Sequence, residues 1–487
     1  MQLLFRADGN NKIGLGHLVR CLALAEMLQP YYQCAFAVQE PSEAIIQQVQ
    51  NSGCAVIELP ATTNYLAEAA YLAQTYAGKF AGVILDGYYF GTDYQRAFRP
   101  FFKIFCLDDL HTIHFVADAV VNPAGNVAPE NYAKEVYTKV FAGPEYALLR
   151  KPFLAAAASS RTLPAEPRVL VNMGGADPAN FTVPVIHQLL QQPLDFKTEV
   201  VVGSAYQHLT SLEELARKHA GKVSIHRQLS AAAMCRLMQA CRLAVLPPST
   251  VAYEWCSVGG PLFLIRTAEN QKNIENFLVQ KELAWPYSEH NPLLPGAFSD
   301  PTFFSGQVRK QRFYFDGQSP NRIRQVFDQL FYPELLQVRR AQLNDLQLLF
   351  HWINDPLVRQ FSLNPEPIPL VTHTAWFQYK LSDKNCYIFI AEIRQEPIGM
   401  IRFDIHQGEA IISYLIDKNF RGKGLGTLML SAGILKFKNL NLPVKHVSGL
   451  VQKENTASIK AFTKVGFSVN PSPDKNHPHV LKFTLPI

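Results

Sequence analysis

Residues 6–28 read RADGNNKIGLGHLVRCLALAEML and place a glycine-rich turn between an apolar strand-like run and a helix-like run. Gly14 and Gly16 let backbone amides in this turn approach an anion without a Cβ in the way. A second turn of different design, RGKGLG at residues 421–426, also follows an apolar run and opens a helical pattern. The two turns predict two ligands that carry diphosphates, and two enzymes on one polypeptide.

The bulk composition is that of a globular protein with several domains. The chain has 487 residues, 48% hydrophobic and 18% charged, which is too long for one core and predicts two to four domains. Its formal net charge of +6 is slight, and no dense Lys/Arg stripe with interleaved aromatics occurs, so we expect no nucleic-acid partner. No signal-peptide core or run of 18 apolar residues occurs, which predicts a cytoplasmic protein without a membrane partner. The oligomeric state stays open.

The eight cysteines are scattered along the chain without a CxxC pair. We expect them to be reduced core residues and not a disulfide frame or a zinc site. No cluster of His, Asp or Glu in the first 330 residues has metal-ligand spacing, so we expect chemistry there that needs no metal.

Residues 1–155 alternate short apolar runs with helical patterns, which is typical of a parallel doubly wound sheet. The expected strands are residues 3–6, 34–38, 83–85, 104–107 and 119–121. Several of them end in polar residues, namely Asp8, Asp86, Asp108, Asp109 and Asn122. Ligands gather at the carboxyl ends of such strands. Asp86, Asp108 and Asp109 are therefore either substrate ligands or helix N-caps.

Residues 165–332 form a second α/β set. Its expected strands are residues 169–172, 199–202, 223–226, 243–246 and 262–265. The segment 151–167 is rich in Ala, Ser and Pro and predicts a hinge or linker. Two α/β units of similar size joined by a short hinge place a ligand cleft between them.

Residues 336–487 have a different pattern of expected helices and strands, which predicts a mixed α+β domain. An amphipathic helix pattern is followed by expected strands at 387–392, 397–404 and 409–416, whose short turns favour antiparallel pairing. The glycine turn at 421–426 then leads into an expected helix at 427–438.

His17 opens the first predicted helix, residues 17–28. The positive end of the helix macrodipole disfavours a cationic imidazole there, and a neutral imidazole is what a general base needs near pH 7. The alternative is that His17 merely caps or packs at the helix start. Arg20, one turn on, is a candidate charge partner for a carboxylate or phosphate.

The string at residues 6–28 resembles the opening of the nucleotide-sugar hydrolases that remove UDP from UDP-2,4-diacetamido-2,4,6-trideoxy-β-L-altropyranose in pseudaminic acid biosynthesis. Further matches follow in the same order: GPEYALLRKPF (143–153), NMGGADPANFT (172–182), STVAYEWCSVGGP (249–261) and AENQ (268–271). The resemblance covers roughly residues 1–330. It implies a GT-B-like pair of Rossmann-type lobes, with the nucleotide held chiefly by the second lobe.

This resemblance implies that His17 activates water for inverting attack at the anomeric carbon. The implied substrate-binding residues are Asp8, Gly14, Gly16, Arg20, Ser249, Thr250, Glu254, Asn270 and Gln271. Glu254 would hold the uridine ribose hydroxyls, the alternative being a solvated helix residue. The helix N-terminus at residues 249–250 would face the diphosphate. Many relatives carry two glycines just before it, whereas Pro247 and Pro248 offer no amide donors.

The amides of RGKGLG form an anion nest at a helix N-terminus, with two basic side chains adding charge. This strand–loop–helix setting resembles the acetyl-CoA pyrophosphate loop of GCN5-related N-acetyltransferases (GNAT). The string ENTASIKAFTKVGF (454–467) fits the same family, and the resemblance covers about residues 336–487. The implied acetyl-CoA contacts are Arg421, Gly422, Lys423, Gly424, Leu425, Gly426 and Asn455.

The resemblance implies direct attack of a substrate amine on the acetyl-CoA thioester. A backbone amide near residues 414–416 would polarise the carbonyl oxygen, and Asn455, the implied catalytic residue, would contact the cofactor or an ordered water. Relatives often place a tyrosine where Phe462 stands, to protonate the departing thiolate. Phenylalanine cannot donate that proton, so the general acid is unassigned, and water or free thiolate release are the alternatives.

Four further side chains of this domain have two interpretations each. Tyr414 and His446 are candidates for the base, or structural residues. Trp352 and Trp376 line an acceptor pocket, or pack in the core as such residues usually do.

The sequence thus favours a bifunctional enzyme that uses acetyl-CoA and a UDP-linked amino sugar. One domain would acetylate the 4-amino group of UDP-4-amino-4,6-dideoxy-β-L-AltNAc, and the lobes would hydrolyse the product to UDP and the free sugar. One alternative is a GT-B glycosyltransferase with a sugar or lipid acceptor, fused to an amino-sugar acetyltransferase. Another is a non-catalytic nucleotide-sugar sensor that carries an active acetyltransferase.

Overall fold

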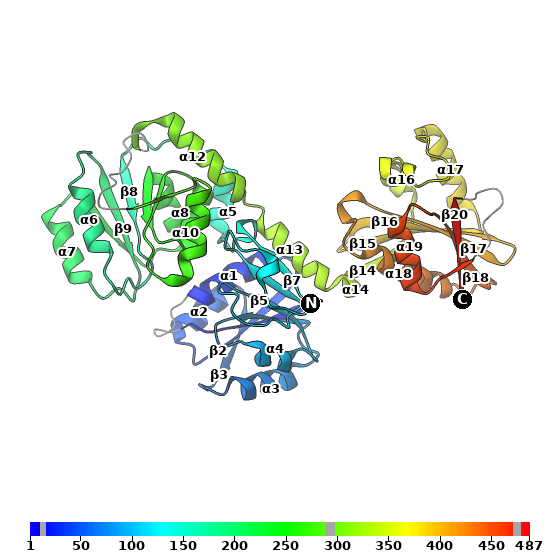
Figure 1. Cartoon of the computed structure of the whole chain (residues 1–487), viewed down its shortest axis with the longest axis horizontal. Coiled ribbons are helices and arrows are strands. Elements are labelled where there is room, and N and C mark those ends of the chain that lie inside the picture. Colours follow the sequence, from blue (N-terminus) through cyan, green and yellow to red (C-terminus); the bar gives the residue numbers. More distant parts are fainter. Residues whose placement is uncertain (10–15, 288–297, 471–478) are drawn as a thin grey trace. The chain divides into compact units, whose positions relative to one another are not determined.

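The structure is a computed structural model that describes residues 1–9, 16–287, 298–470 and 479–487. The chain divides into two compact units, Met1–Leu330 and Phe331–Ile487. The first unit contains two parallel sheets, and the second unit contains one mixed sheet (Figure 1). Gly14, expected in the first phosphate-binding turn, lies outside the described residues.

The first lobe is built on a sheet in which all neighbouring strands run parallel. In spatial order the strands are β3 (Ala55–Leu59), β2 (Gln33–Gln39), β1 (Gln2–Ala7), β4 (Gly82–Asp86), β5 (Lys103–Leu107), β6 (Ala119–Asn122) and β7 (Lys139–Ala142). Its helices are α1 (Gly16–Leu28), α2 (Glu43–Asn51), α3 (Tyr65–Tyr76) and α4 (Thr92–Phe98). The strand order reverses between β1 and β4, so the carboxyl ends of these two strands flank the crevice where such sheets bind ligands.

The second lobe repeats this architecture with another wholly parallel sheet. In spatial order the strands are β10 (Val223–Arg227), β9 (Lys197–Val202), β8 (Arg168–Val171), β11 (Leu243–Leu246), β12 (Leu262–Leu264) and β13 (Trp285–Pro286). Its helices are α5 (Lys151–Ala158), α6 (Thr182–Leu190), α7 (Leu209–Lys218), α8 (Ala231–Ala240), α9 (Thr250–Val258), α10 (Lys272–Gln280) and α12 (Pro301–Tyr314). Helix α13 (Ser319–Leu330) returns to the first lobe, where Phe327 stacks on Phe105 with ring centroids 4.2 Å apart.

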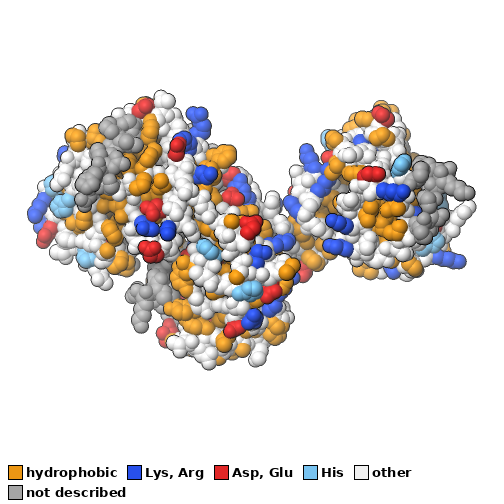
Figure 2. Space-filling model, viewed as in Figure 1, with side chains coloured by type: hydrophobic (Ala, Val, Ile, Leu, Met, Phe, Trp, Pro, Cys, Tyr) orange, Lys and Arg blue, Asp and Glu red, His pale blue; other side chains and the backbone are white. Residues whose placement is uncertain are grey.

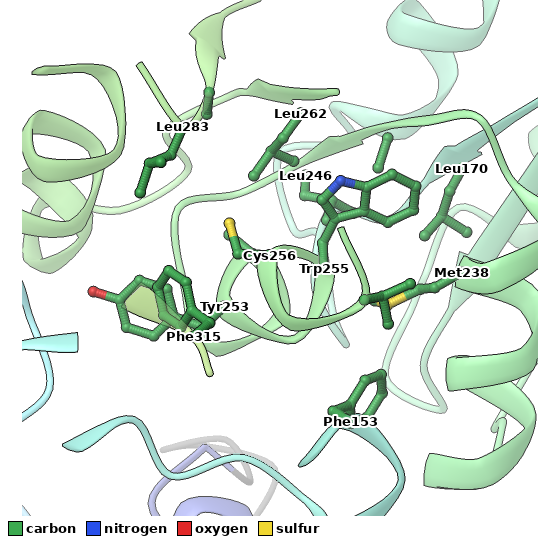
Figure 3. Packing of buried hydrophobic residues seen from close by; sticks show 14 of the residues in the cluster. Phe153, Leu170, Met238, Leu246, Tyr253, Trp255, Cys256, Leu262, Leu283 and Phe315 are labelled. Atoms are coloured by element: carbon green, nitrogen blue, oxygen red, sulfur yellow. The ribbon is translucent and has the colours of Figure 1, made fainter. Parts of the chain in front are cut away.

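Helix α9 is buried almost entirely in the core of the second lobe. Trp255 is fully buried among Phe153, Leu170 and Met238, and its Nε1 donates to the carbonyl oxygen of Gly260 over 2.9 Å (Figure 3). This packing fixes the helix axis, and with it the N-terminus of α9 beyond the end of β11.

The expected linker at residues 151–167 is in part wrong. Residues Lys151–Ala158 form helix α5, and Phe153 of this helix is fully buried in the core of the second lobe. The alanines that make the segment resemble a linker let the helix pack closely on α8 and α9. Only the part beyond residue 158 lacks regular structure up to β8.

The second unit is an α+β fold around one mixed sheet. In spatial order its strands are β14 (Leu336–Arg340), β15 (Cys386–Ile393), β16 (Glu396–His406), β17 (Glu409–Ile416), β18 (His446–Gln452), β20 (Val480–Pro486) and β19 (Ser468–Asn470). Its helices are α14 (Tyr332–Leu335), α15 (Leu346–Ile353), α16 (Pro356–Gln360), α17 (Leu370–Ser382), α18 (Leu425–Lys438) and α19 (Thr456–Val465). Neighbouring strands are antiparallel except β17 and β18, which run parallel.

Strands β17 and β18 separate halfway along their length. They pair from Glu409 and His446 as far as Ile412 and Gly449. Beyond that point residues 413–416 keep their pairing with β16 on one side, but within the described residues no strand pairs with their other edge. The sheet therefore contains a slot that is lined by unpaired backbone.

The eight cysteines lie in the core. All of them are buried, and none forms a disulfide. In the part of the chain that the structure describes, no helix is both long and apolar enough to cross a membrane. Basic and acidic side chains are interspersed on the face of the first unit that Figure 2 shows.

Candidate active sites

His17 and Arg20 of α1 share one buried carboxylate. The Nδ1 atom of His17 lies 2.7 Å from Oδ1 of Asp86, the last residue of β4, and Nε of Arg20 donates to Oδ2 of Asp86 over 2.6 Å. Burial alone would raise the pKa of Asp86, but the Arg20 charge and the hydrogen bonds from Arg20 and His17 lower it to about 2. Asp86 is therefore a carboxylate at neutral pH.

The contact with Asp86 favours one tautomer of His17. A carboxylate only accepts hydrogen bonds, so the contact favours a proton on Nδ1, and this tautomer has the free lone pair on Nε2. The edge of Tyr88 meets the imidazole at a centroid distance of 4.8 Å. Both side chains line a cavity of about 140 Å³, together with Asp8, Asp86 and the aromatic side chains at 89–90. A histidine that is oriented by a carboxylate and faces a cavity has the geometry of a general base.

The second lobe reaches this cluster through Asn270. Asp109 accepts hydrogen bonds from Nη1 of Arg20 over 3.1 Å and from the hydroxyl of Tyr88 over 3.2 Å. Nδ2 of Asn270 donates to the same hydroxyl over 3.3 Å. Tyr88 thus links Asn270 of the second lobe to Asp109 at the carboxyl ends of the strands in the first lobe.

Asp8 belongs to a second buried network beside the cavity. Arg6, which is fully buried, donates to Oδ1 of Asp8 over 2.5 Å and to Glu68 over 2.8 Å. The backbone amide of Gln39 also donates to Oδ1 of Asp8 over 3.0 Å. Asp8 therefore anchors the end of β1 as well as lining the cavity.

Two of the predicted polar residues stabilise their own loops. Asp108 accepts from the backbone amides of Leu110 and His111 and from the hydroxyl of Tyr132, so it caps a turn and not a helix. Oε1 of Gln271 accepts from the backbone amides at 267 and 268 over 2.8 and 3.3 Å. Neither side chain has its acceptor atom free for a substrate in this arrangement.

Ser249 and Thr250 stand at the accessible start of α9, and Ser249 is its N-cap residue without a side-chain cap bond. Glu254 is buried one turn further on, so the alternative of a solvated helix residue is wrong. Both of its carboxylate oxygens accept from Arg150, over 2.7 and 2.8 Å. Burial raises the pKa of Glu254 against the opposing effect of Arg150.

In the second unit the separation of β17 and β18 opens into a cavity of about 540 Å³. Its lining comes from α15, from residues 357–363, from β16, β17 and β18, and from the start of α19. Arg421, Tyr414 and Asn455 are among the lining residues. This volume is within the range that small-molecule and cofactor sites occupy.

The second glycine turn has the conformation of an anion nest. Gly422 and Gly424 have φ of +76° and +77°, and Gly424 is the N-cap residue of α18, which begins two residues before the expected helix. Arg421 is already engaged: its Nε donates to the carbonyl oxygen of Ile416 over 3.0 Å and its Nη2 to Asp355 over 2.8 Å. The Nζ of Lys423 lies 5.1 Å from the centroid of the Phe420 ring.

Asn455 is the N-cap of α19, and its side chain accepts from the amide of Ser458 over 3.1 Å. The hydroxyl of Tyr414 donates to Oγ of Ser458, also over 3.1 Å. Phe462 follows one turn later, with its ring centroid 5.9 Å from that of Tyr414. The start of α19 therefore meets the slot edge of β17 through a tyrosine–serine pair.

The other aromatic and basic candidates are not among the described residues that line this cavity. His446 pairs with Glu409 at 3.6 Å, and Nε1 of Trp352 donates to Asp417 over 2.8 Å. Trp376 packs against the Arg402 guanidinium at 5.2 Å and a hydrophobic cluster. These contacts favour the structural interpretation of all three residues.

Sequence reasoning missed Tyr88, Arg150 and Arg359, which lie in or beside the two sites. Tyr88 stands two residues after the strand-end Asp86 in the run DGYY, and that was a usable signal. Arg150 meets Glu254 across 104 residues of sequence, so no local pattern could have paired them.

Comparison with known proteins gives a family match that begins close to the boundary between the two units. Residues 336–468 match the family model described as "Acetyltransferase (GNAT) domain". Over 485 residues the chain is 25% identical to the uncharacterized protein MJ1062 of Methanocaldococcus jannaschii, which covers 96% of both chains. It is 24% identical over 285 residues to the UDP-2,4-diacetamido-2,4,6-trideoxy-beta-L-altropyranose hydrolase of Campylobacter jejuni, covering 58% of this chain and 97% of that protein.

A third relative is the spore coat polysaccharide biosynthesis protein SpsG of Bacillus subtilis. It is 26% identical over 275 residues, which cover 54% of this chain and 77% of that protein. These findings and the sheet topology confirm the predicted fold class, a GT-B-like pair of Rossmann-type lobes followed by an α+β GNAT domain.

Proposed function

We propose that the chain is a bifunctional enzyme of nucleotide-sugar metabolism. The second unit transfers the acetyl group of acetyl-CoA to the 4-amino group of UDP-4-amino-4,6-dideoxy-β-L-AltNAc. The first unit hydrolyses the product, UDP-2,4-diacetamido-2,4,6-trideoxy-β-L-altropyranose, to UDP and the free sugar with inversion.

The observation that carries the hydrolase half is the contact between His17 and Asp86. With the proton on Nδ1, the Nε2 atom is available to take a proton from water as the water attacks the anomeric carbon. Arg20 holds the same carboxylate, so the imidazole is fixed in orientation from two sides. The similarity to the Campylobacter hydrolase over most of that protein's length supports the same assignment.

The acetyltransferase half is supported by the cavity of the GNAT domain. The slot edge of β17 offers backbone groups to an extended cofactor chain, and the nest at residues 421–426 suits its diphosphate. Among its described lining residues the cavity has Arg359, Arg402 and Arg421 but no carboxylate. Arg402 and Arg421 pair with Asp404 and Asp355 behind the lining, whereas Arg359 donates to carbonyl oxygens and to Ser362. Such a lining favours an amine carried on an anionic molecule, as in a UDP-sugar, over a polyamine.

Incubation of the whole protein with acetyl-CoA and the 4-amino UDP-sugar tests the proposal, with products followed by mass spectrometry. We expect CoA, UDP and one diacetamido sugar. His17→Ala should abolish release of UDP and leave nucleotide binding and acetylation intact, whereas His187→Gln, a change at an exposed histidine of α6, should change neither.

Three results would contradict the proposal. UDP release that requires a sugar or lipid acceptor would favour a glycosyltransferase. UDP release that survives in His17→Ala would exclude His17 as the base. No release at all, with tight nucleotide binding, would favour a sensor.

A further inference from the structure

The acetyltransferase cavity offers few groups that can give up a proton. Within the described lining, the side chains with exchangeable protons are Arg359, Arg402, Arg421, Ser362, Ser413, Ser458, Gln452, Asn455 and Tyr414. Arginine stays charged in proteins, and serine and amide groups are far weaker acids than a phenol. Tyr414 is therefore the group in this lining whose acidity comes nearest to that of a thiol.

Tyr414 also stands at the right place in the fold. It belongs to the stretch of β17 that has separated from β18, where unpaired backbone lines the slot. Its hydroxyl contacts Ser458 of α19 at 3.1 Å and lies 3.6 Å from the position that a Cβ of Gly426 would occupy, at the start of α18. The hydroxyl thus lies where the strand edge and two helix N-termini converge.

We propose that Tyr414 is the general acid of the acetyltransferase and protonates the sulfur of the departing CoA. This inference rests on the proposed acetyl transfer. The amine nitrogen bonds to the thioester carbonyl carbon, the carbon–sulfur bond breaks with its electron pair going to sulfur, and the sulfur takes the phenolic proton. The nitrogen then releases its surplus proton to water, and the phenolate regains one from water, so the products are an amide and a thiol.

The surroundings keep the phenol protonated and oriented. Burial raises the pKa of Tyr414, and the hydrogen bond with Ser458 only partly offsets that effect. The Phe462 ring packs edge-on against Tyr414, which restricts the phenol from the α19 side without competing for the proton. A strand residue can therefore supply the proton that Phe462, on the helix, cannot.

The test compares Tyr414→Phe with Tyr387→Phe in the full-length protein. Tyr387 is also a partly buried strand tyrosine of the second unit, on β15, but it does not line the cavity. We expect Tyr414→Phe to lower kcat for CoA release about 100-fold, the low end for loss of a general acid, while the Kd of acetyl-CoA stays within twofold. Tyr387→Phe should change neither quantity.

Acetyl transfer to water, measured as slow CoA release without an amine, provides the same comparison independently of the sugar. If the wild-type protein shows no CoA release that depends on the UDP-amino sugar, the proposed acceptor fails, but the ratio of Tyr414→Phe to wild type in water still reports on the acid. A kcat within threefold of wild type in Tyr414→Phe would overturn the assignment. So would an equal loss of acetyl-CoA affinity, which indicates a structural role.

Discussion

At the scale of single residues, the first site depends on Asp86. It is fully buried, and it accepts hydrogen bonds from both His17 and Arg20. Replacing it leaves an arginine and a histidine without their shared anion in a buried place, which is among the costly changes in a protein. The same carboxylate therefore determines both the orientation of the base and part of the stability of the first lobe.

This role predicts that the free energy of unfolding falls at low pH. The pKa of Asp86 is about 2 in the folded protein against about 3.9 in an unfolded chain, so its contribution is complete above pH 4 and is lost as the pH falls from about 4 to about 2. The contribution is on the order of 2 kcal/mol. Asp86→Asn should lower the free energy of unfolding at pH 7 and flatten its decline below pH 4, as measured by urea denaturation.

The exposed aspartate of α4 provides the control. The side chain of Asp93 is 70% exposed, so Asp93→Asn should leave the unfolding curve unchanged at both pH values. A decline below pH 4 that is as steep in Asp86→Asn as in the wild type would show that other carboxylates cause it.

At the scale of elements, the proposed binding of acetyl-CoA depends on the backbone conformation of the glycine turn before α18. Gly424→Ala places a Cβ at φ +77°, which costs about 1 kcal/mol of stability and disturbs the amides of the nest. We expect the Kd of acetyl-CoA to rise about tenfold, as measured by calorimetry. Gly408→Ala, at φ +81° in the turn between β16 and β17, should cause a similar loss of stability without changing the Kd of acetyl-CoA. Equal affinity in both variants would show that the nest does not hold the cofactor.

Elements with a strong local pattern were predictable, and weakly patterned ones were not. The buried strands β1, β4, β8 and β11 are nearly continuous apolar runs, and each lies where the sequence places a strand. The edge strand β3 has only five residues, of which Leu59 alone is buried, so its pattern is weak. Helix α5 was not predicted, because an alanine-rich segment is compatible with both a linker and a tightly packed helix.

The candidate sites divide in the same way. His17 and Arg20 lie one turn apart on a helix, so their common face follows from the sequence alone. Their contact with Asp86 joins residues 66 and 69 positions apart, and it depends on the parallel pairing of β1 with β4. The loop role of Gln271 depends on backbone geometry that composition does not encode.

At the scale of the whole molecule, the proposed function places two active sites on one chain, and such an arrangement raises the local concentration of a shared intermediate. We expect the wild-type protein to release free sugar with a shorter lag than an equimolar mixture of His17→Ala and Tyr414→Phe chains at low enzyme concentration. In the mixture the acetylated intermediate must diffuse between molecules. Equal lags, measured by quenched time courses of UDP release, would show that the tether has no kinetic effect.

The slot between β17 and β18 also affects how the protein behaves without its cofactor. Unpaired strand edges accept any extended chain with free amides, including a segment of a second molecule. An empty slot is thus an aggregation hazard in the middle of a sheet, where edge charges and edge prolines give no protection. In the proposed function the pantetheine arm of acetyl-CoA covers this backbone, so we expect acetyl-CoA to reduce aggregation of the protein as well as to serve as its substrate.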